Sequence, residues 1–148
     1  MNDTIRALEL SKFAHWQHEP ANFDHAVNVA RRVANDPRGN NTHIATAYLQ
    51  SIGHTARITR PDMIIAGIPA RVVRAVTRLE HIEGETFLAF LRRVSDHEDT
   101  ALVAYHDFEE RLQNLPEEVD STDDVIRRLR IATADLNESI NRGVPKSG

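Results

Sequence analysis

Histidine and arginine are the residues of this 148-residue chain most suited to chemistry. The chain contains eight histidines, and an imidazole can bind a metal ion or transfer protons near neutral pH. Of the 18 basic residues, all but Lys12 and Lys146 are arginines. Arginine recognises phosphate bidentately, although the coding bias of a GC-rich genome gives the same excess. Cysteine is absent, which excludes a thiolate metal site, a cysteine nucleophile and disulfides.

Charge and hydropathy narrow the class of partner. The net charge is −4, with 22 acidic and 18 basic residues, which gives no general electrostatic case for nucleic-acid binding. The longest apolar runs are a few residues long, against the roughly 20 needed to span a bilayer. The segment MNDTIRALEL has no basic stretch before an apolar one, so no signal peptide is visible. We therefore expect a cytoplasmic protein that binds neither nucleic acid nor membrane.

Helices must position these residues, because apolar side chains recur at spacings of three and four along most of the chain. No segment alternates apolar and polar residues for long enough to require a strand. A length of 148 residues is typical of one domain with its own core. We expect an all-α bundle of about six to eight helices over residues 1–142, followed by a disordered tail over 143–148.

Prolines, glycines and capping residues mark the expected helix ends. A break at 18–22 separates the first two helices, because a residue before proline is disfavoured in the α conformation. The third helix is apolar around most of its circumference, as is typical of burial on several sides, and Gly53 ends it. Ser121 and Thr122 are the expected N-caps of the last helix. The other expected helices cover residues 3–17, 23–35, 42–52, 70–79 and 98–112, with shorter ones starting near 60 and 87.

Four segments stand out by their order along the chain. They are FAHWQHEPANFDHAVNVA (13–30), TAYLQSIGHTARIT (46–59), AGIPARVVRAVTRLEHIEGETFLAFLRRV (66–94) and ALVAYHDFEERL (101–112). Together they resemble the successive motifs of the HD phosphohydrolase superfamily, especially the branch that hydrolyses guanosine tetraphosphate. The similarity covers roughly residues 5–115. It is carried by Ala14, His15 and Gln17, by His25 before an apolar run, by Gly67-Ile68-Pro69 and by Asp107.

The resemblance implies a metal-dependent phosphohydrolase, but the chain departs from the family at the metal site. Family members hold a divalent ion with a histidine, a His-Asp doublet and a distal aspartate. Here the doublet position is Gln50-Ser51, so only His25 and Asp107 remain. The site has lost one negative charge and one imidazole, and Gly53-His54 replaces the acidic pair of the guanosine-tetraphosphate branch. We therefore expect no bound cofactor.

The departures leave two main hypotheses about function. In the first, a catalytically degenerate HD domain keeps a polar pocket and binds a small molecule, such as a nucleotide or another phosphorylated ligand. The ligand-binding residues would be Gln50, Ser51, His15, Arg57 and Arg78. In a plainer interpretation, Gln50 and Ser51 have no ligand and only fill the space of the former metal site. Arg57 and Arg78 would then lie on a solvent-exposed helix face.

In the second hypothesis the chain is an enzyme. His25, Asp107 and His54 would form a rebuilt site for Mn²⁺ or another divalent ion, or would act without metal as acid and base. The alternative for His25 and Asp107 is that each is buried and hydrogen-bonded without a catalytic role. A third class of function is a purely structural domain that forms a homo-oligomer.

Among the other histidines, His106 could join His25, His54 and Asp107 in a rearranged metal site, but its position disfavours this. His106 precedes Asp107 on a helix, so the two side chains point about 100° apart and should not face one cavity. A surface or helix-end position is the plainer interpretation for His15, and it is the expected one for His43, His81 and His97.

Overall fold

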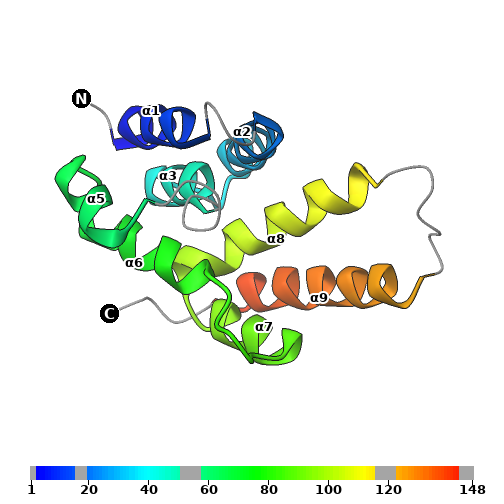
Figure 1. Ribbon diagram of the computed structural model, residues 1–148. Helices are drawn as coiled ribbons and strands as arrows, with labels where there is room; N and C mark the ends of the chain where they lie inside the picture. The colour runs from blue at the N-terminus through cyan, green and yellow to red at the C-terminus, as the bar shows by residue number, and fades with distance from the viewer. Residues whose placement is uncertain (1–2, 16–19, 51–57, 116–122, 144–148) are drawn as a thin grey trace.

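The computed structural model describes residues 3–15, 20–50, 58–115 and 123–143, and within them the regular structure is entirely helical (Figure 1). This confirms the expected all-α bundle of six to eight helices. No helix of the described part is both long and apolar enough to cross a membrane. The helices are α1 (Asp3–His15), α2 (Pro20–Ala34), α3 (Asn41–Leu49), α5 (Arg60–Ile65), α6 (Ala70–Leu79), α7 (Phe87–Ser95), α8 (Glu98–Gln113) and α9 (Asp124–Asn141).

The larger of two hydrophobic cores lies between α2, α3, α7 and the antiparallel pair α8 and α9, which run side by side in Figure 1. Its side chains come from stripes with helical spacing, such as Val29 and Val33 on α2. Phe90 and Val94 on α7 extend this core, and Leu136 of α9 is 2% exposed. Burial of each large side chain of this kind contributes about 1.5–3 kcal/mol.

A smaller core joins α1, α5 and α6 to α3. Ala45 and Leu49 of α3 belong to this core, whereas Ala47 belongs to the larger one. Five of the nine residues of α3 are buried, which agrees with the expectation of a helix that is apolar on most sides. The helix therefore lies between the two cores, and its C-terminal end is held in place by both.

The expected break at 18–22 is wrong at its C-terminal end, because α2 begins at Pro20 and not at Phe23. Proline is tolerated in the first turn of a helix, where its missing N–H would have no intrahelical partner. The helix boundary thus falls directly before the proline instead of after the whole segment. The expected ends of the first and third helices, Gln17 and Gly53, lie outside the described residues.

The cap of the last helix also differs from the expectation. Asp123 precedes α9, and its Oδ1 accepts a hydrogen bond from the Val125 N–H at 2.8 Å. Ser121 and Thr122 lie outside the described residues. Of the expected tail, only Gly143 is described; it adopts a φ of 83°, which glycine accommodates without steric cost.

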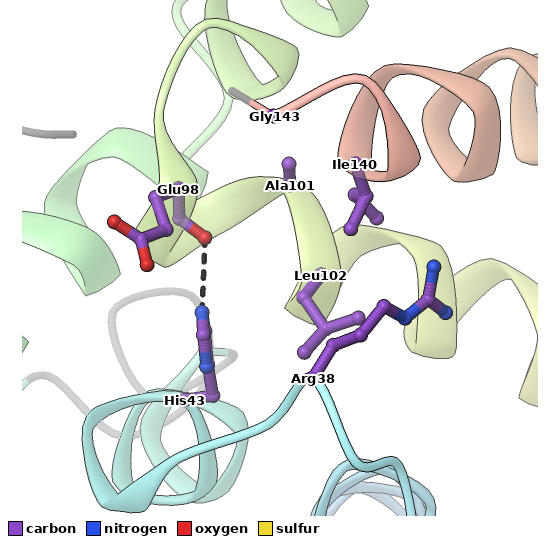
Figure 2. Close-up of a pocket in the computed structure, with 7 residues that line it drawn as sticks. All are labelled: Arg38, His43, Glu98, Ala101, Leu102, Ile140 and Gly143. Carbon is purple, nitrogen blue, oxygen red and sulfur yellow. Dashed lines mark hydrogen bonds between the residues drawn. The ribbon is translucent and has the colours of Figure 1, made fainter. Parts of the chain in front are cut away.

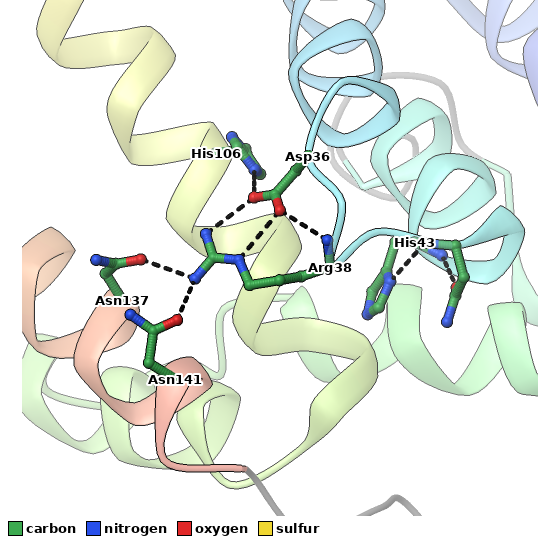
Figure 3. A network of polar contacts seen from close by, with 7 residues as sticks. Asp36, Arg38, His43, His106, Asn137 and Asn141 are labelled. Atoms are coloured by element: carbon green, nitrogen blue, oxygen red, sulfur yellow. Dashed lines mark hydrogen bonds and ion pairs between the residues drawn. The ribbon is translucent and has the colours of Figure 1, made fainter.

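A polar network ties the loop after α2 to α8 and α9 (Figure 3). The Arg38 guanidinium donates to both Asp36 oxygens, at 3.0 and 2.9 Å, and His106 Nε2 lies 2.8 Å from Oδ2 of the same carboxylate. Arg38 Nη1 also donates to the side-chain oxygens of Asn137 and Asn141 on α9. The hydrogen bonds from Arg38 hold the pKa of Asp36 well below its ordinary value. Burial lowers the pKa of His106.

Candidate functional site

A cavity of about 300 Å³ lies where α2, the end of α3, α7 and α8 meet. Three residues singled out in the sequence line it, namely His25 on α2, Gln50 directly after α3 and Asp107 on α8. Val29 and Val103 lie one helical turn from His25 and Asp107, and both are fully buried. Packing of these two valines in the larger core therefore brings the two polar side chains together.

His25 and Asp107 form a direct contact, with 2.5 Å between Nε2 and Oδ1. The two side chains are 23% and 14% exposed, so the pair is largely shielded from solvent. An ionised carboxylate can only accept, and the proton between these atoms is therefore carried by Nε2. If the imidazole is neutral, its Nδ1 is left as a hydrogen-bond acceptor.

Arg111 extends this pair and was missed by the sequence reasoning. Its Nε donates to Oδ2 of Asp107 at 3.3 Å, and the side chain is 57% exposed. One oxygen of Asp107 thus faces an imidazole and the other faces a guanidinium. The signal for this contact was present in the sequence, since residues four apart on a helix share a face.

Gln50 contributes a buried hydrogen-bond donor that no residue in the described ranges uses. Its Nε2 is buried and has no hydrogen-bond partner within the described part of the chain. A buried amide without a partner costs about 1–3 kcal/mol. Such a group, lining the same cavity as His25 and Asp107, is the feature of this site that most clearly lacks a structural explanation.

Aromatic rings supply much of the remaining lining. The His81 ring stacks on Phe90, with ring centroids 4.4 Å apart and an interplanar angle of 23°. Phe87 and Phe108 lie further along the lining, with their centroids 6.1 Å apart. His81 is exposed, as expected, but it also lines the cavity, which the sequence did not indicate. The exposed rings of Phe87 and His81 offer a surface on which a flat ring can stack.

A wider groove of about 650 Å³ adjoins the cavity, and the two share His25 and Arg111. The groove is more acidic, because Asp24 and Glu110 line it. An anionic group is therefore better placed in the cavity beside Gln50 than in the groove. The groove leaves room for a second part of a ligand to extend past Arg111.

The described residues do not fit the metal site that the family resemblance implies. No group of three or more histidine, aspartate or glutamate side chains in the described ranges is placed to hold a metal ion. His25 and Asp107 contact each other directly, and Gln50 offers a neutral amide in place of an imidazole. The third proposed ligand, His54, lies outside the described residues. We therefore derive no chemical step through a metal.

The remaining predicted site residues are not brought to this cavity by the described structure. Ser51 and Arg57 lie outside the described residues, and so does the side chain of His15, the last residue of α1. Arg78 does not line the cavity. The Arg78 carbonyl accepts a hydrogen bond from Arg93. Burial, and then the nearby charge of Arg78, lowers the pKa of His97.

Two other histidines are fixed by partners elsewhere. His106 points to Asp36, away from the cavity that Asp107 lines, as their adjacent positions on a helix predicted. His43 is a helix-end residue, as expected, but it is buried at 2% exposure. Its Nδ1 accepts the Asn40 N–H at 3.1 Å and its Nε2 donates to the Glu98 carbonyl at 2.9 Å, at the edge of a separate cavity of about 180 Å³ (Figure 2). Both nitrogens are used, so His43 serves the fold.

Comparisons with known proteins do not assign a family. The sequence matches no protein-family model, and no curated protein matches it. The residues that line the cavity indicate its chemistry. They provide an unpaired amide donor, a carboxylate-bound imidazole, a half-exposed guanidinium and aromatic faces. That combination suits a ligand with an anionic group and a flat ring.

Proposed function

We propose that the chain is a degenerate HD-type domain that binds a small phosphorylated ligand, such as a nucleotide, in the cavity between α2, α3, α7 and α8. The observation that carries the proposal is the buried Nε2 of Gln50, which has no hydrogen-bond partner among residues 3–15, 20–50, 58–115 and 123–143. A ligand that accepts this hydrogen bond would remove the cost of the unsatisfied donor. Gln50 is neutral and lines the cavity at the position where the HD family has its charged His-Asp doublet. A neutral amide donor in place of that charged doublet favours an anionic ligand.

Arg111 supports the phosphate part of the proposal. Only its Nε is used by Asp107, and its two Nη atoms have no partner among the described residues. A guanidinium binds phosphate oxygens through charge-assisted hydrogen bonds. Both oxygens of Asp107 already have a donor, His25 on one side and Arg111 on the other. This pairing reduces the repulsion that a free carboxylate would exert on an anionic ligand.

The aromatic lining supports the nucleotide part. The exposed rings of Phe87 and His81 line the cavity beside the polar residues, and Phe90 supports the His81 ring from behind. Stacking of a nucleobase on an aromatic side chain contributes about 1–3 kcal/mol and does not depend strongly on which base is present. The cavity volume of about 300 Å³ lies at the lower end of the range for ligand pockets. The adjoining groove would hold any larger substituent.

A second candidate function is favoured by the His25–Asp107 pair. A carboxylate that orients an imidazole is the arrangement used for general acid–base catalysis. The 2.5 Å contact lies at the cavity wall, where such a pair would reach a bound ligand. In this alternative the chain hydrolyses the phosphorylated ligand without a metal ion.

Calorimetric titration with guanosine and adenosine mono- and diphosphates tests the binding function. We expect Gln50→Leu to weaken binding by about tenfold, which corresponds to about 1.4 kcal/mol. The same substitution should stabilise the ligand-free protein by about 1 kcal/mol in urea unfolding, because it removes a buried donor that has no partner. Opposite effects on binding and on stability are the signature of a residue kept for a ligand.

Arg111→Ala should also weaken binding, whereas Arg92→Ala is the matched control, since Arg92 is exposed on α7 and does not line the cavity. Absence of binding for every nucleotide at millimolar concentration, or unchanged binding to Gln50→Leu, contradicts the proposal. Chromatography of the same mixtures, with a chelator present, detects hydrolysis products and so distinguishes ligand binding from metal-independent hydrolysis. Product formation that His25→Asn abolishes would identify the metal-independent enzyme.

A further inference from the structure

The surface between α7 and α9 is largely apolar, and none of the described helices covers it. A groove of about 420 Å³ runs between the two helices, with Leu88 and Leu91 on one side and Ile131 and Ala132 on the other. Leu88 is 58% exposed and Ile131 is 57% exposed. Contiguous exposed apolar side chains of this kind mark interaction surfaces. In Figure 1, α7 and α9 lie on one side of α8, and α1, α2 and α3 lie on the other.

Two charges of opposite sign flank the centre of this surface. Arg128 precedes Ile131 by three residues and Asp135 follows it by four, so all three lie on one face of α9, and both charged residues line the groove. The charges are seven residues apart, or roughly 10 Å along the helix axis. Asp135 has no partner in the described residues, and the Arg128 Nη2 is 4.0 Å from the nearest Asp124 oxygen.

This pattern is complementary to itself when the helix is reversed. The midpoint between Arg128 and Asp135 falls between Ile131 and Ala132. Two copies of α9 packed antiparallel about that point place each Arg128 opposite the partner's Asp135. A parallel arrangement would instead bring like charges together. Two-fold interfaces require such self-complementary patches, whereas a surface for a different protein does not.

We propose that the α7–α9 groove is the interface of a symmetric homodimer, in which two α9 helices pack antiparallel and the partner's Ile131 enters the groove beside Leu88 and Leu91. The apolar side chains provide the driving force, and the two Arg128–Asp135 pairs fix the orientation and the register. The occupant of the groove is thus a second copy of this chain.

Sedimentation equilibrium over a range of concentrations tests the dimer with the full chain. The wild type should reach a mass twice that of one chain, and Ile131→Asp should weaken association by about a hundredfold, because the new charge enters the interface twice. Ile65→Asp is the matched control, since Ile65 is 84% exposed on α5, and it should leave association unchanged. Circular dichroism verifies that each variant is folded.

Charge reversal tests the antiparallel register. Arg128→Asp and Asp135→Arg should each weaken association by about tenfold or more, because each variant places two pairs of like charges in contact. The double variant restores opposite charges with the polarity exchanged, and its affinity should return to near that of the wild type. A strictly monomeric wild type overturns the proposal and leaves another protein as the occupant. A dimer that is insensitive to Ile131→Asp, or single variants that the double variant does not rescue, overturns it as well.

Discussion

Replacement of Arg71 with alanine is expected to lower the free energy of unfolding by about 2–4 kcal/mol. Arg71 on α6 donates from Nε and Nη2 to the two oxygens of Asp99 on α8, both at 2.8 Å. The Asp99 side chain is 1% exposed, so the substitution leaves a buried carboxylate without its counter-charge. The Arg71 side chain is 45% exposed, and water that replaces it keeps the loss below that for a fully buried pair.

Urea unfolding of the wild type, Arg71→Ala and Arg74→Ala measures this effect. Arg74 is exposed on the same helix and has no partner within the described residues, so its replacement should change the stability by less than about 0.5 kcal/mol. Arg71→Lys should fall between the two, since an ammonium keeps the charge but loses the paired geometry. Equal stabilities of Arg71→Ala and Arg74→Ala would show that the Arg71–Asp99 ion pair contributes no net stability.

The protein should lose about 2 kcal/mol of stability through Asp36 alone between pH 7 and pH 2.5. The hydrogen bonds from Arg38, and then that from His106, hold the pKa of this carboxyl well below its ordinary value. In the unfolded chain the carboxyl titrates near pH 4. Because the pKa of Asp36 is lower in the folded protein, the ionised carboxyl stabilises the fold at any pH above the unfolded-state pKa. This contribution declines as the pH falls from about 4 toward the folded-state pKa.

His106 adds a second loss at higher pH. Burial lowers its pKa in the folded protein, so the unfolded chain binds a proton first as the pH falls below about 6.5. Stability should therefore decrease in two ranges, one below pH 6.5 and one below pH 4. The network in Figure 3 is the origin of both.

Urea midpoints of the wild type and Asp36→Asn between pH 7 and pH 2.5 isolate the carboxyl. The deficit of the variant should be greatest at pH 7 and should shrink by about 2 kcal/mol as the pH reaches 2.5. Glu9→Gln, which neutralises an exposed carboxylate on α1, is the control and should follow the wild type. If the difference in stability between Asp36→Asn and the wild type does not change with pH, the charge of Asp36 does not contribute to stability.

Helix positions were predictable from the sequence because their signals are local. For α6, the turn Gly67-Ile68-Pro69 placed the helix over residues 70–79, which agrees with the observed Ala70–Leu79. The start of α2 was misplaced because Pro20 was read as the centre of a break. Proline excludes the preceding residue from a helix but is itself a good first residue, and the sequence alone did not decide between these roles.

The meeting of His25, Gln50 and Asp107 was predictable only through the family resemblance. His25 and Asp107 are 82 residues apart, and no periodicity connects positions at that distance. Their proposed roles stay predictions, and those of Ser51, His54 and Arg57 concern residues outside the described part. Gln50 was identified as a departure from a motif, whereas the unpaired state of its amide is a property of the packed structure.

Other contacts of the fold required tertiary information. His43 was expected at the surface or at a helix end, and its burial depends on the Glu98 carbonyl, which comes from a helix distant in the sequence. The contact of Asp36 with His106 joins residues 70 apart. Arg111 is the exception, since its spacing from Asp107 could have identified it.

The position of α3 between the two cores has a consequence for how the molecule opens. Because Leu49 belongs to one core and Ala47 to the other, neither core can come apart while the other keeps its full set of contacts. The described helices should therefore unfold as a single cooperative unit and not in halves. Backbone amides of α3 are expected to exchange with deuterium only through global unfolding, at a rate close to that of the slowest amides in α8. Fast exchange in α3 alone would show that the two cores open separately.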